Sequence, residues 1–275
     1  MCNPVIHTGS NSQTKSVAVI PARYGSTRLP GKPLLEIAGK PLIVWVAERA
    51  RAAATISRTI IATDDPRIVD AVNAAGFDAV ITRADHATGT DRIAEVAHNL
   101  RADIIVNVQG DEPLIDPETI DRAVQALIDD PEAQISTIWE PITNEADINN
   151  PSVVKVTFDK AGYATNFSRN PNSNQANEKS VSTESSPAVG LLFNFKKHTG
   201  LYAYRREFLL QFARWPQTEN ERRESLEQLR ALDRDVKIKV VPAASPSIGV
   251  DTLEDLERVR AIVARVGAHA SGVPS

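Results

Sequence analysis

In the first half of the chain, short apolar runs alternate with longer segments in which apolar residues recur every three or four positions. Such runs are typical of buried strands, and such segments are typical of helices that cover a sheet. This alternation predicts an α/β fold with a mostly parallel sheet and helices on both faces. We predict strands over 16–20, 58–63, 77–81, 103–109 and 134–139, and helices over 41–54, 66–75, 89–100 and from Pro117 onward. Asp65 and Asp116 are the expected caps of the second and fourth of these helices.

The pattern changes after Asn150. Two short strands flank the polar turn 159–162, which predicts an antiparallel pair, and residues 170–187 are so poor in large apolar side chains that we expect a long mobile loop. The remaining predicted elements are strands 153–158, 163–167, 201–204 and 236–241, helices 205–213 and 221–232, and a final helix that Thr252 and Asp255 cap.

These elements predict one α/β domain over residues 16–265, with a smaller β-rich insertion at about 151–215. Residues 1–15 are rich in Asn, Ser and Thr and are expected to form a disordered tail, and residues 266–275 are expected to form a frayed tail.

Composition narrows the possible partners. The hydrophobic content is 42% and the net charge is −4, with scattered positive residues, so a nucleic-acid partner is not expected. No apolar run approaches the roughly 20 residues of a membrane span, and the first residues lack a signal-peptide core, so we expect no membrane association. The only cysteine is Cys2, which excludes an internal disulfide and suits a cytoplasmic location.

The segment that follows the first predicted strand is cationic. Arg23, Arg28 and Lys32 lie close together in the sequence, on a segment with Gly25 and Gly31. A cationic loop with glycines at the carboxyl end of a first strand suits a polyphosphate ligand. The spacing matches neither the P-loop nor the dinucleotide-binding turn, and a solvated basic loop is the alternative interpretation.

Two aspartates follow other apolar runs. Asp111 comes after a predicted strand, and Asp251 precedes the last helix. In open α/β sheets, ligands bind at the carboxyl ends of strands, and magnesium takes one or two protein carboxylates together with phosphate oxygens. These residues therefore predict a magnesium site beside the phosphate loop; taken singly, each aspartate also fits a role as a turn acid or helix cap.

A further polar loop, residues 82–92, follows the third predicted strand and offers backbone amides and hydroxyls that could bind the edge of a base. By itself, His86 also fits a surface histidine, and Thr88 or Thr90 also fits a helix cap.

Several blocks of the chain together resemble the 3-deoxy-manno-octulosonate (KDO) cytidylyltransferase family. The opening block is 21–34, with the sequence PARYGSTRLPGKPL. The other blocks follow in family order between residues 17 and 262: 82–86, 89–92, 106–113, 154–156, 167–169, 198–205, 226–230 and 249–252.

The resemblance implies a three-layer Rossmann-like nucleotidyltransferase fold with a smaller β-rich dimerisation and substrate module. It implies that CTP and KDO give CMP-KDO and pyrophosphate for lipopolysaccharide biosynthesis, with Mg²⁺ and in a homodimer. Carried over to this sequence, it makes Lys32, Asp111 and Asp251 catalytic and assigns the metal to Asp111 and Asp251. The implied CTP-binding residues are Arg23, Tyr24, Gly25, Arg28, Lys32, Thr63, Asp64, His86, Gly89, Thr90 and Gln109, and the implied sugar-binding residues are Gln109, Arg169, His198, Tyr202, Glu227 and Gln228.

The sequence departs from the family pattern in two places. A polar tract begins at Asn170 where the family is apolar, and residues 233–235 replace a usual Trp and Gly. A cytidylyltransferase for another sugar acid, such as 8-amino-KDO or sialic acid, is therefore the main alternative. A glycosyltransferase would normally carry Asp-x-Asp where this chain has Gln109-Gly110-Asp111, and a non-catalytic relative would not be expected to keep both aspartates.

Overall fold

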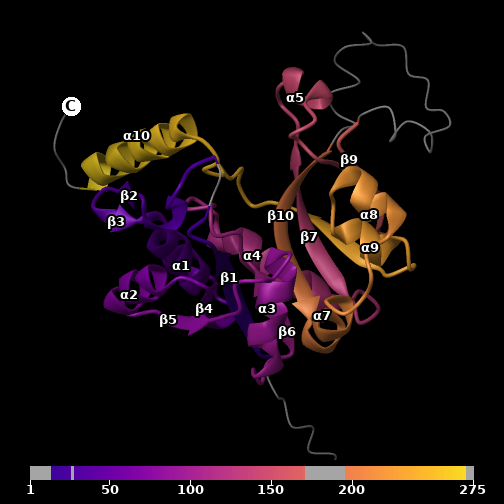
Figure 1. Ribbon diagram of the computed structural model, residues 1–275. Coiled ribbons are helices and arrows are strands. Elements are labelled where there is room, and N and C mark those ends of the chain that lie inside the picture. Colours follow the sequence, from indigo (N-terminus) through magenta and orange to yellow (C-terminus); the bar gives the residue numbers. More distant parts are fainter. Residues whose placement is uncertain (1–13, 26–27, 171–195, 271–275) are drawn as a thin grey trace, which may run out of the picture.

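The computed structural model describes residues 14–25, 28–170 and 196–270, and its centre is a nine-stranded sheet (Figure 1). The main strand order is β11-β7-β10-β6-β1-β4-β5, and β8 and β9 extend the sheet from β10. The strands are β1 (Ser16–Ala22), β4 (Ile56–Thr63), β5 (Asp78–Ile81), β6 (Ile104–Asn107), β7 (Ile135–Pro141), β8 (Lys155–Phe158), β9 (Ala164–Ser168), β10 (Lys196–Arg205) and β11 (Ile238–Pro242), and β2 (Glu36–Ile37) and β3 (Lys40–Pro41) form a separate pair.

In the main path of the sheet, β10 is the one strand that runs against its neighbours. It pairs antiparallel with β6 and β7, whereas the pairs β1–β4, β1–β6, β4–β5 and β7–β11 are parallel. The predicted mostly parallel mixed sheet is therefore confirmed. The sequence of β1 is almost wholly apolar because both faces of this central strand are covered.

Helices cover both faces of the sheet, which confirms the three-layer α/β architecture. Apolar residues of α1, α2, α4 and α10 form one core with one face, and those of α3, α7 and α9 form a second core with the other. The helices are α1 (Leu42–Ala52), α2 (Pro66–Ala74), α3 (Gly89–His98), α4 (Pro117–Asp129), α5 (Ala146–Asn149), α7 (Arg206–Phe212), α8 (Glu219–Glu224), α9 (Gln228–Leu232) and α10 (Leu253–Ala270), with a 3₁₀ turn η1 at Lys32–Leu34.

The expected capping residues are present at the starts of the predicted helices. The Asp65 and Asp116 carboxylates accept hydrogen bonds from the backbone of the first turns of α2 and α4, and each helix has proline at its first position. Thr88 and Asp91 form a capping box at α3. At α10, the Thr252 hydroxyl accepts from the Asp255 amide while the Asp255 carboxylate accepts from the Thr252 amide, as predicted.

Three predicted elements of the second half differ from the structure, and the short helix α5 was not predicted. The single helix predicted over 221–232 is two helices, α8 and α9, because Ser225 takes left-handed backbone angles with φ of 53°. The strand predicted over 201–204 extends over Lys196–Arg205, since it pairs in turn with β8, β7 and β6. Helix α10 continues to Ala270, past residue 265 where the domain was predicted to end.

Within the predicted module of about 151–215, β8 and β9 form the expected antiparallel pair, and β10 joins this pair to the main sheet. The module boundaries stay a prediction. The predicted disordered tail up to residue 13, and residues 171–187 of the predicted loop, lie outside the described residues. Within the described ranges, no helix is long and apolar enough to cross a membrane.

The topology singles out one edge of the sheet. From β1, the chain passes to β4 on one side, whereas β6 pairs with β1 on the other side. The loops after β1 and β6 therefore diverge at a switch point of the strand order, which is where open α/β sheets bind ligands. A Cβ at Gly110 would lie 2.6 Å from the Pro21 carbonyl oxygen, so glycine allows the loop after β6 to approach the end of β1.

Candidate active site

The cationic loop after β1 turns sharply before η1. Gly31 has φ of 68°, a left-handed conformation that favours glycine, and a Cβ there would lie 3.2 Å from the Tyr24 ring. Gly25 has no atom within 4 Å of a Cβ position, so the structure gives no steric reason for glycine there. The turn at Gly31 directs the Lys32 side chain to two carboxylates.

Lys32, Asp111 and Asp251 form the centre of the candidate site. Lys32 Nζ lies 2.8 Å from Asp111 Oδ2 and 3.1 Å from Asp251 Oδ1, although the three residues come from different loops. Arg28 Nη1 lies 3.0 Å from Asp251 Oδ2 on the exposed side of the cluster. Burial alone would lower the pKa of Lys32, but its attraction to Asp111 and hydrogen bonds to both aspartates raise the pKa.

The two aspartates meet the chemical requirements of a magnesium site in part. Their oxygens converge on a single cationic atom, Lys32 Nζ, and carboxylate oxygens are preferred magnesium ligands. No group of three or more His, Cys, Asp or Glu side chains in the described part of the chain could hold a metal ion. Two carboxylates are enough when phosphate oxygens and water complete the shell.

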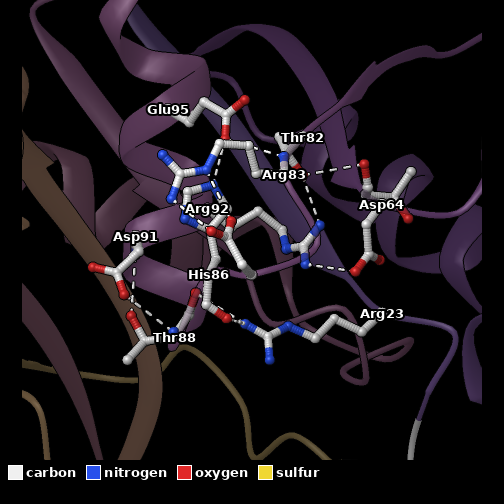
Figure 2. A network of polar contacts seen from close by, with 11 residues as sticks. Arg23, Asp64, Thr82, Arg83, His86, Thr88, Asp91, Arg92 and Glu95 are labelled. Carbon is white, nitrogen blue, oxygen red and sulfur yellow. Dashed lines mark hydrogen bonds and ion pairs between the residues drawn. The ribbon is translucent and has the colours of Figure 1, made fainter.

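Arg23 lies apart from this cluster and holds the 82–92 loop instead. Figure 2 shows its guanidinium directed at that loop, where Nη2 donates to the His86 carbonyl at 2.6 Å and to the Thr88 carbonyl at 3.3 Å. The three predicted phosphate cations thus divide in the structure: Arg28 and Lys32 contact the carboxylates, and Arg23 joins two loops.

The ends of β4 and β5 are tied together beside the same loop. The Thr63 carbonyl accepts from the Thr82 amide at 2.8 Å and from the Thr82 hydroxyl at 3.1 Å. Arg92, which is fully buried, donates to Thr82 Oγ1 at 2.6 Å and to Asp64 Oδ2 at 3.0 Å (Figure 2). The structure therefore fixes Thr63 and Asp64, two predicted CTP residues, through one buried guanidinium.

His86 and Thr90 also have protein partners. The His86 ring contacts the Glu95 carboxylate on α3 through Nε2. Thr90, in the first turn of α3, donates its hydroxyl hydrogen bond to Glu227, which directly precedes α9. Burial raises the pKa of Glu227, although hydrogen bonds from Thr90 and Thr88 oppose the effect. Thr90 and Glu227 thus link predicted CTP-binding and sugar-binding residues.

A hollow of about 460 Å³ adjoins these residues. It lies where the start of α3, the end of β6, the first residues and the middle of β10, and the start of α9 meet. We call it the polar hollow. Its wall includes all six predicted sugar-binding residues, of which Gln109 is also a predicted CTP residue, and two further predicted CTP residues. These are Gln109, Arg169, His198, Tyr202, Glu227 and Gln228, with Gly89 and Thr90.

His198 is neutral in this setting. Burial lowers its pKa to about 3, and its Nε2 lies 2.9 Å from the Thr137 hydroxyl. Because that hydroxyl donates to the Leu201 carbonyl at 2.8 Å, its oxygen accepts from the histidine N–H, and Nδ1 remains an acceptor. His198 can therefore accept a hydrogen bond from a ligand through Nδ1, but it supplies no positive charge.

Arg169 supplies the charge that His198 lacks. Its Nε donates to the Glu224 carbonyl at 3.1 Å and its Nη1 donates to the Pro151 carbonyl at 3.0 Å. No carboxylate among the described residues pairs with this guanidinium, so a positive charge borders the polar hollow. Lys197 also borders it, but its Nζ lies 3.4 Å from the Glu140 carboxylate.

Sequence reasoning missed several residues of this region. Asn107 and Lys197 line the polar hollow, and Arg92 fixes Asp64. Glu112 follows Asp111, and burial raises its pKa to about 7. An asparagine at the end of an apolar strand was a usable signal for Asn107; the partners of Arg92 lie on other elements and left no local signal.

Comparison with known proteins identifies the class. A cytidylyltransferase family model matches residues 17–238. A solved structure of CMP:2-keto-3-deoxy-manno-octonic acid synthetase complexed with CTP is 43% identical, has a TM-score of 0.82, and the match covers 92% of this chain and 99% of that chain. The chain therefore belongs to the cytidylyltransferases.

Curated relatives narrow the class. The 3-deoxy-manno-octulosonate cytidylyltransferase of Trichlorobacter lovleyi is 49% identical over 89% of this chain and 96% of its own length. The enzyme of the same name from Escherichia coli is 43% identical over 92% of this chain and 97% of its own length. Within the cytidylyltransferases, this chain belongs to the 3-deoxy-manno-octulosonate cytidylyltransferase family, as the sequence motifs predicted.

Proposed function

We propose that this chain transfers the cytidylyl group of CTP to KDO, with CMP-KDO and pyrophosphate as products. The observation that carries the proposal is the position of the Lys32–Asp111–Asp251 cluster next to the polar hollow. Gln109 lines the hollow and Asp111, two residues later, contacts Lys32, so a short loop after β6 joins the two regions.

The CTP half of the site would be built on the first loop and the 82–92 loop. Arg28 and Lys32 would face the triphosphate, because their charges lie at the carboxyl ends of the central strands. Arg23 would act by holding the 82–92 loop against the first loop, where Gly89 and Thr90 begin α3. Tyr24, Gly25, Thr63, Asp64 and His86 complete the proposed CTP set.

Asp111 and Asp251 would hold Mg²⁺ together with the triphosphate. When bound, this ion would neutralise charge that develops on the phosphoryl oxygens and on the leaving pyrophosphate. The two carboxylates suit this role because they converge on one cation and are only partly buried.

The sugar half would be the polar hollow. Among the described residues no carboxylate pairs with Arg169, so its charge suits the sugar-acid carboxylate. The polar groups of Gln109, His198, Tyr202, Glu227 and Gln228 suit the sugar hydroxyls. Since Glu227 accepts a hydrogen bond from Thr90 at the start of α3, the sugar pocket is linked directly to the proposed base-binding loop.

The chemistry is a single displacement at phosphorus. The anomeric hydroxyl oxygen of KDO forms a bond to the α-phosphorus of CTP, the bond from that phosphorus to the bridging oxygen of the β-phosphate breaks, and the hydroxyl proton leaves. Pyrophosphate carries away the bonding electrons. No protein nucleophile takes part, so Arg28 and Lys32 would act by offsetting negative charge as it develops.

Three further properties are proposed from the family. The chain would act as a homodimer, in the cytoplasm, in the supply of activated KDO for lipopolysaccharide. The sequence shows no long apolar run. Although the net charge is −4, the cations Arg28 and Lys32 are gathered at the site where the anionic substrates would bind.

Pyrophosphate release from CTP tests the proposal. With purified protein, Mg²⁺ and CTP, we expect release that depends on KDO and is much weaker with 8-amino-KDO or sialic acid. Omission of each component is the control. Equal or faster release with another sugar acid would overturn the KDO assignment, and no release with any sugar acid would overturn the activity itself.

A further inference from the structure

Asn107 is a polar residue in a position that favours apolar side chains. It ends the central strand β6, after Ile104, Ile105 and Val106, and pairs with Val19 on β1 and with Tyr202 on β10. It is 4% exposed. Asparagine is disfavoured in strands, so packing alone does not account for it.

Within the described part of the chain, the side-chain Oδ1 of Asn107 is buried without a hydrogen-bond partner. The same holds for the Gln228 side chain, which is 5% exposed and whose Nε2 is buried without a partner. Two unsatisfied buried amides are costly, because each loses its hydrogen bonds with water on folding. A ligand that bonds to them would remove this cost.

Both residues lie on the wall of the polar hollow. Side chains alternate along a strand, so Asn107 shares the face of Ile105, which belongs to the core formed with α3 and α7. Gln228 reaches the same hollow from the first residue of α9. Two elements distant in sequence thus bring two unpaired amides to one polar cavity.

We propose that Asn107 contacts the sugar acid and helps to set specificity, with its amide hydrogen-bonded to a hydroxyl group of the sugar. An amide offers both a donor and an acceptor, and a hydroxyl can use both kinds of bond. Asn107 and Gln228 together would bind such a hydroxyl between them. The assignment rests on the proposed function of the polar hollow as the sugar site, and it adds a residue to that site.

A polar recognition group of this kind acts on specificity more than on general binding. A site with buried amides rejects a substrate that lacks the matching hydroxyl, since the amides then stay unpaired. Asn107 should therefore affect use of the sugar acid while leaving CTP, whose proposed contacts lie on other loops, nearly unaffected.

The test uses Asn107→Leu, which keeps the size of the side chain and removes both hydrogen-bonding groups, and Asn107→Ala as a second variant. The matched control is Thr59→Val, because Thr59 on β4 also has a buried, unpartnered hydroxyl but lies outside the polar hollow. Thermal unfolding verifies that each variant is folded. We expect kcat/KM for KDO to fall about 10- to 100-fold in both Asn107 variants, with KM for CTP and all constants of Thr59→Val within about twofold of the wild type.

Monodeoxy analogues of KDO identify the contacted group. One analogue should be used equally well by the wild type and Asn107→Ala, because the hydroxyl that Asn107 binds is missing. The assignment is overturned if kcat/KM for KDO is unchanged, if KM for CTP rises as much as KM for KDO, or if every analogue separates the two enzymes equally. Wild-type inactivity with KDO would count against the proposed substrate alone, and the Asn107 variants would then be compared on the sugar acid that the wild type accepts.

Discussion

At the scale of single residues, the site is balanced in charge. Arg28 and Lys32 lie within 3.1 Å of the carboxylates of Asp111 and Asp251, so two positive charges offset two negative ones. Such a cluster is stable without a ligand and can exchange partners when a triphosphate and a divalent cation enter together. The carboxylates and the cations then have separate tasks, which substitutions can distinguish.

Asp111→Asn and Asp251→Asn should each reduce turnover by about 100-fold or more, because a metal contact supplies several kcal/mol to the transition state. Pyrophosphate release at saturating Mg²⁺ measures the effect, and circular dichroism shows whether the fold is kept. Asp129→Asn is the control. Asp129 is exposed on α4, and its carboxylate accepts a hydrogen bond from the Gln125 side chain of the same helix. Near-normal activity in either variant would refute the two-carboxylate site.

Lys32→Ala should impair the use of CTP far more than the use of KDO. The ammonium group would lose its proposed contact with the triphosphate, so both CTP binding and the chemical step should suffer. Initial rates with each substrate varied in turn give the two effects separately. Lys40→Ala serves as the comparison, since Lys40 on β3 pairs with Glu48 on α1. A selective rise in KM for KDO would contradict the assignment.

His198 should make the folded state less stable as the pH falls below about 6.5. Burial lowers the pKa of His198 to about 3 in the folded chain, against 6.5 for an ordinary histidine. Above pH 6.5 neither state binds the proton; between 6.5 and 3 only the unfolded state does, so stability decreases. Between pH 7.5 and 5 this residue should cost about 2 kcal/mol of unfolding free energy.

Urea unfolding of the wild type and His198→Gln across that pH range isolates the histidine from the carboxylates that also titrate. The difference in unfolding free energy between the two proteins should change with pH in favour of the variant as the solution becomes acidic. A difference that is independent of pH would show that the folded protein protonates His198 as readily as the unfolded chain does.

At the scale of elements, the break between α8 and α9 decides where Glu227 and Gln228 lie. Ser225 takes the left-handed conformation, and the Leu226 amide then donates to the Glu221 carbonyl at 3.3 Å. Glu221 is in turn held by Arg230 in a buried ion pair, with Arg230 Nε at 2.8 Å from Glu221 Oε2. A continuous helix would turn Glu227 and Gln228 away from their present positions, so the break builds part of the polar hollow.

Ser225→Gly should raise the unfolding free energy by about 0.5–1 kcal/mol, because glycine adopts positive φ without the strain of a side chain. Ser225→Val should lower it, since a β-branched residue fits that conformation poorly. Thermal and urea unfolding measure both variants. If both changes had the same sign, backbone strain at Ser225 would not be the cause.

At the scale of the whole molecule, the β8–β9 pair extends the sheet from β10 (Figure 1). In the described part of the chain, the strand partner of β9 is β8, and an isolated antiparallel bridge, Tyr163–Lys239, joins the residue before β9 to β11, so the outer edge of β9 is paired only at its start. Proteins usually cover or protect such edges. The edge of β9 is therefore a candidate surface for the homodimer that the family resemblance implies.

Native mass spectrometry and light scattering should give a mass twice the 29.9 kDa of one chain. A dilution series is the control, because a specific dimer dissociates only below its dissociation constant whereas nonspecific association decreases gradually. A mass of one chain at micromolar concentration would refute the proposed homodimer.

Local pattern in the sequence determined the main helices and sheet strands of the first half of this protein, but not the short elements η1, β2 and β3. Alternating apolar runs and amphipathic segments identified β1, α1, β4, α2, β5, α3, β6 and α4, and the caps at Asp65, Asp116 and Thr252 are present as predicted. These features depend on residues a few positions apart, so the chain carries the signal locally. The ordered motifs likewise identified the family.

Contacts between distant residues were decided by the tertiary structure alone. Lys32 lies between Asp111 and Asp251, Arg23 holds the 82–92 loop, and Thr90 binds Glu227, because the switch in strand order brings separate loops together. The reversed strand β10 and the left-handed Ser225 also depend on pairing and packing across the sheet. The sequence by itself supplied candidate residues for the chemistry; burial and the meeting of loops decided which partner each residue has.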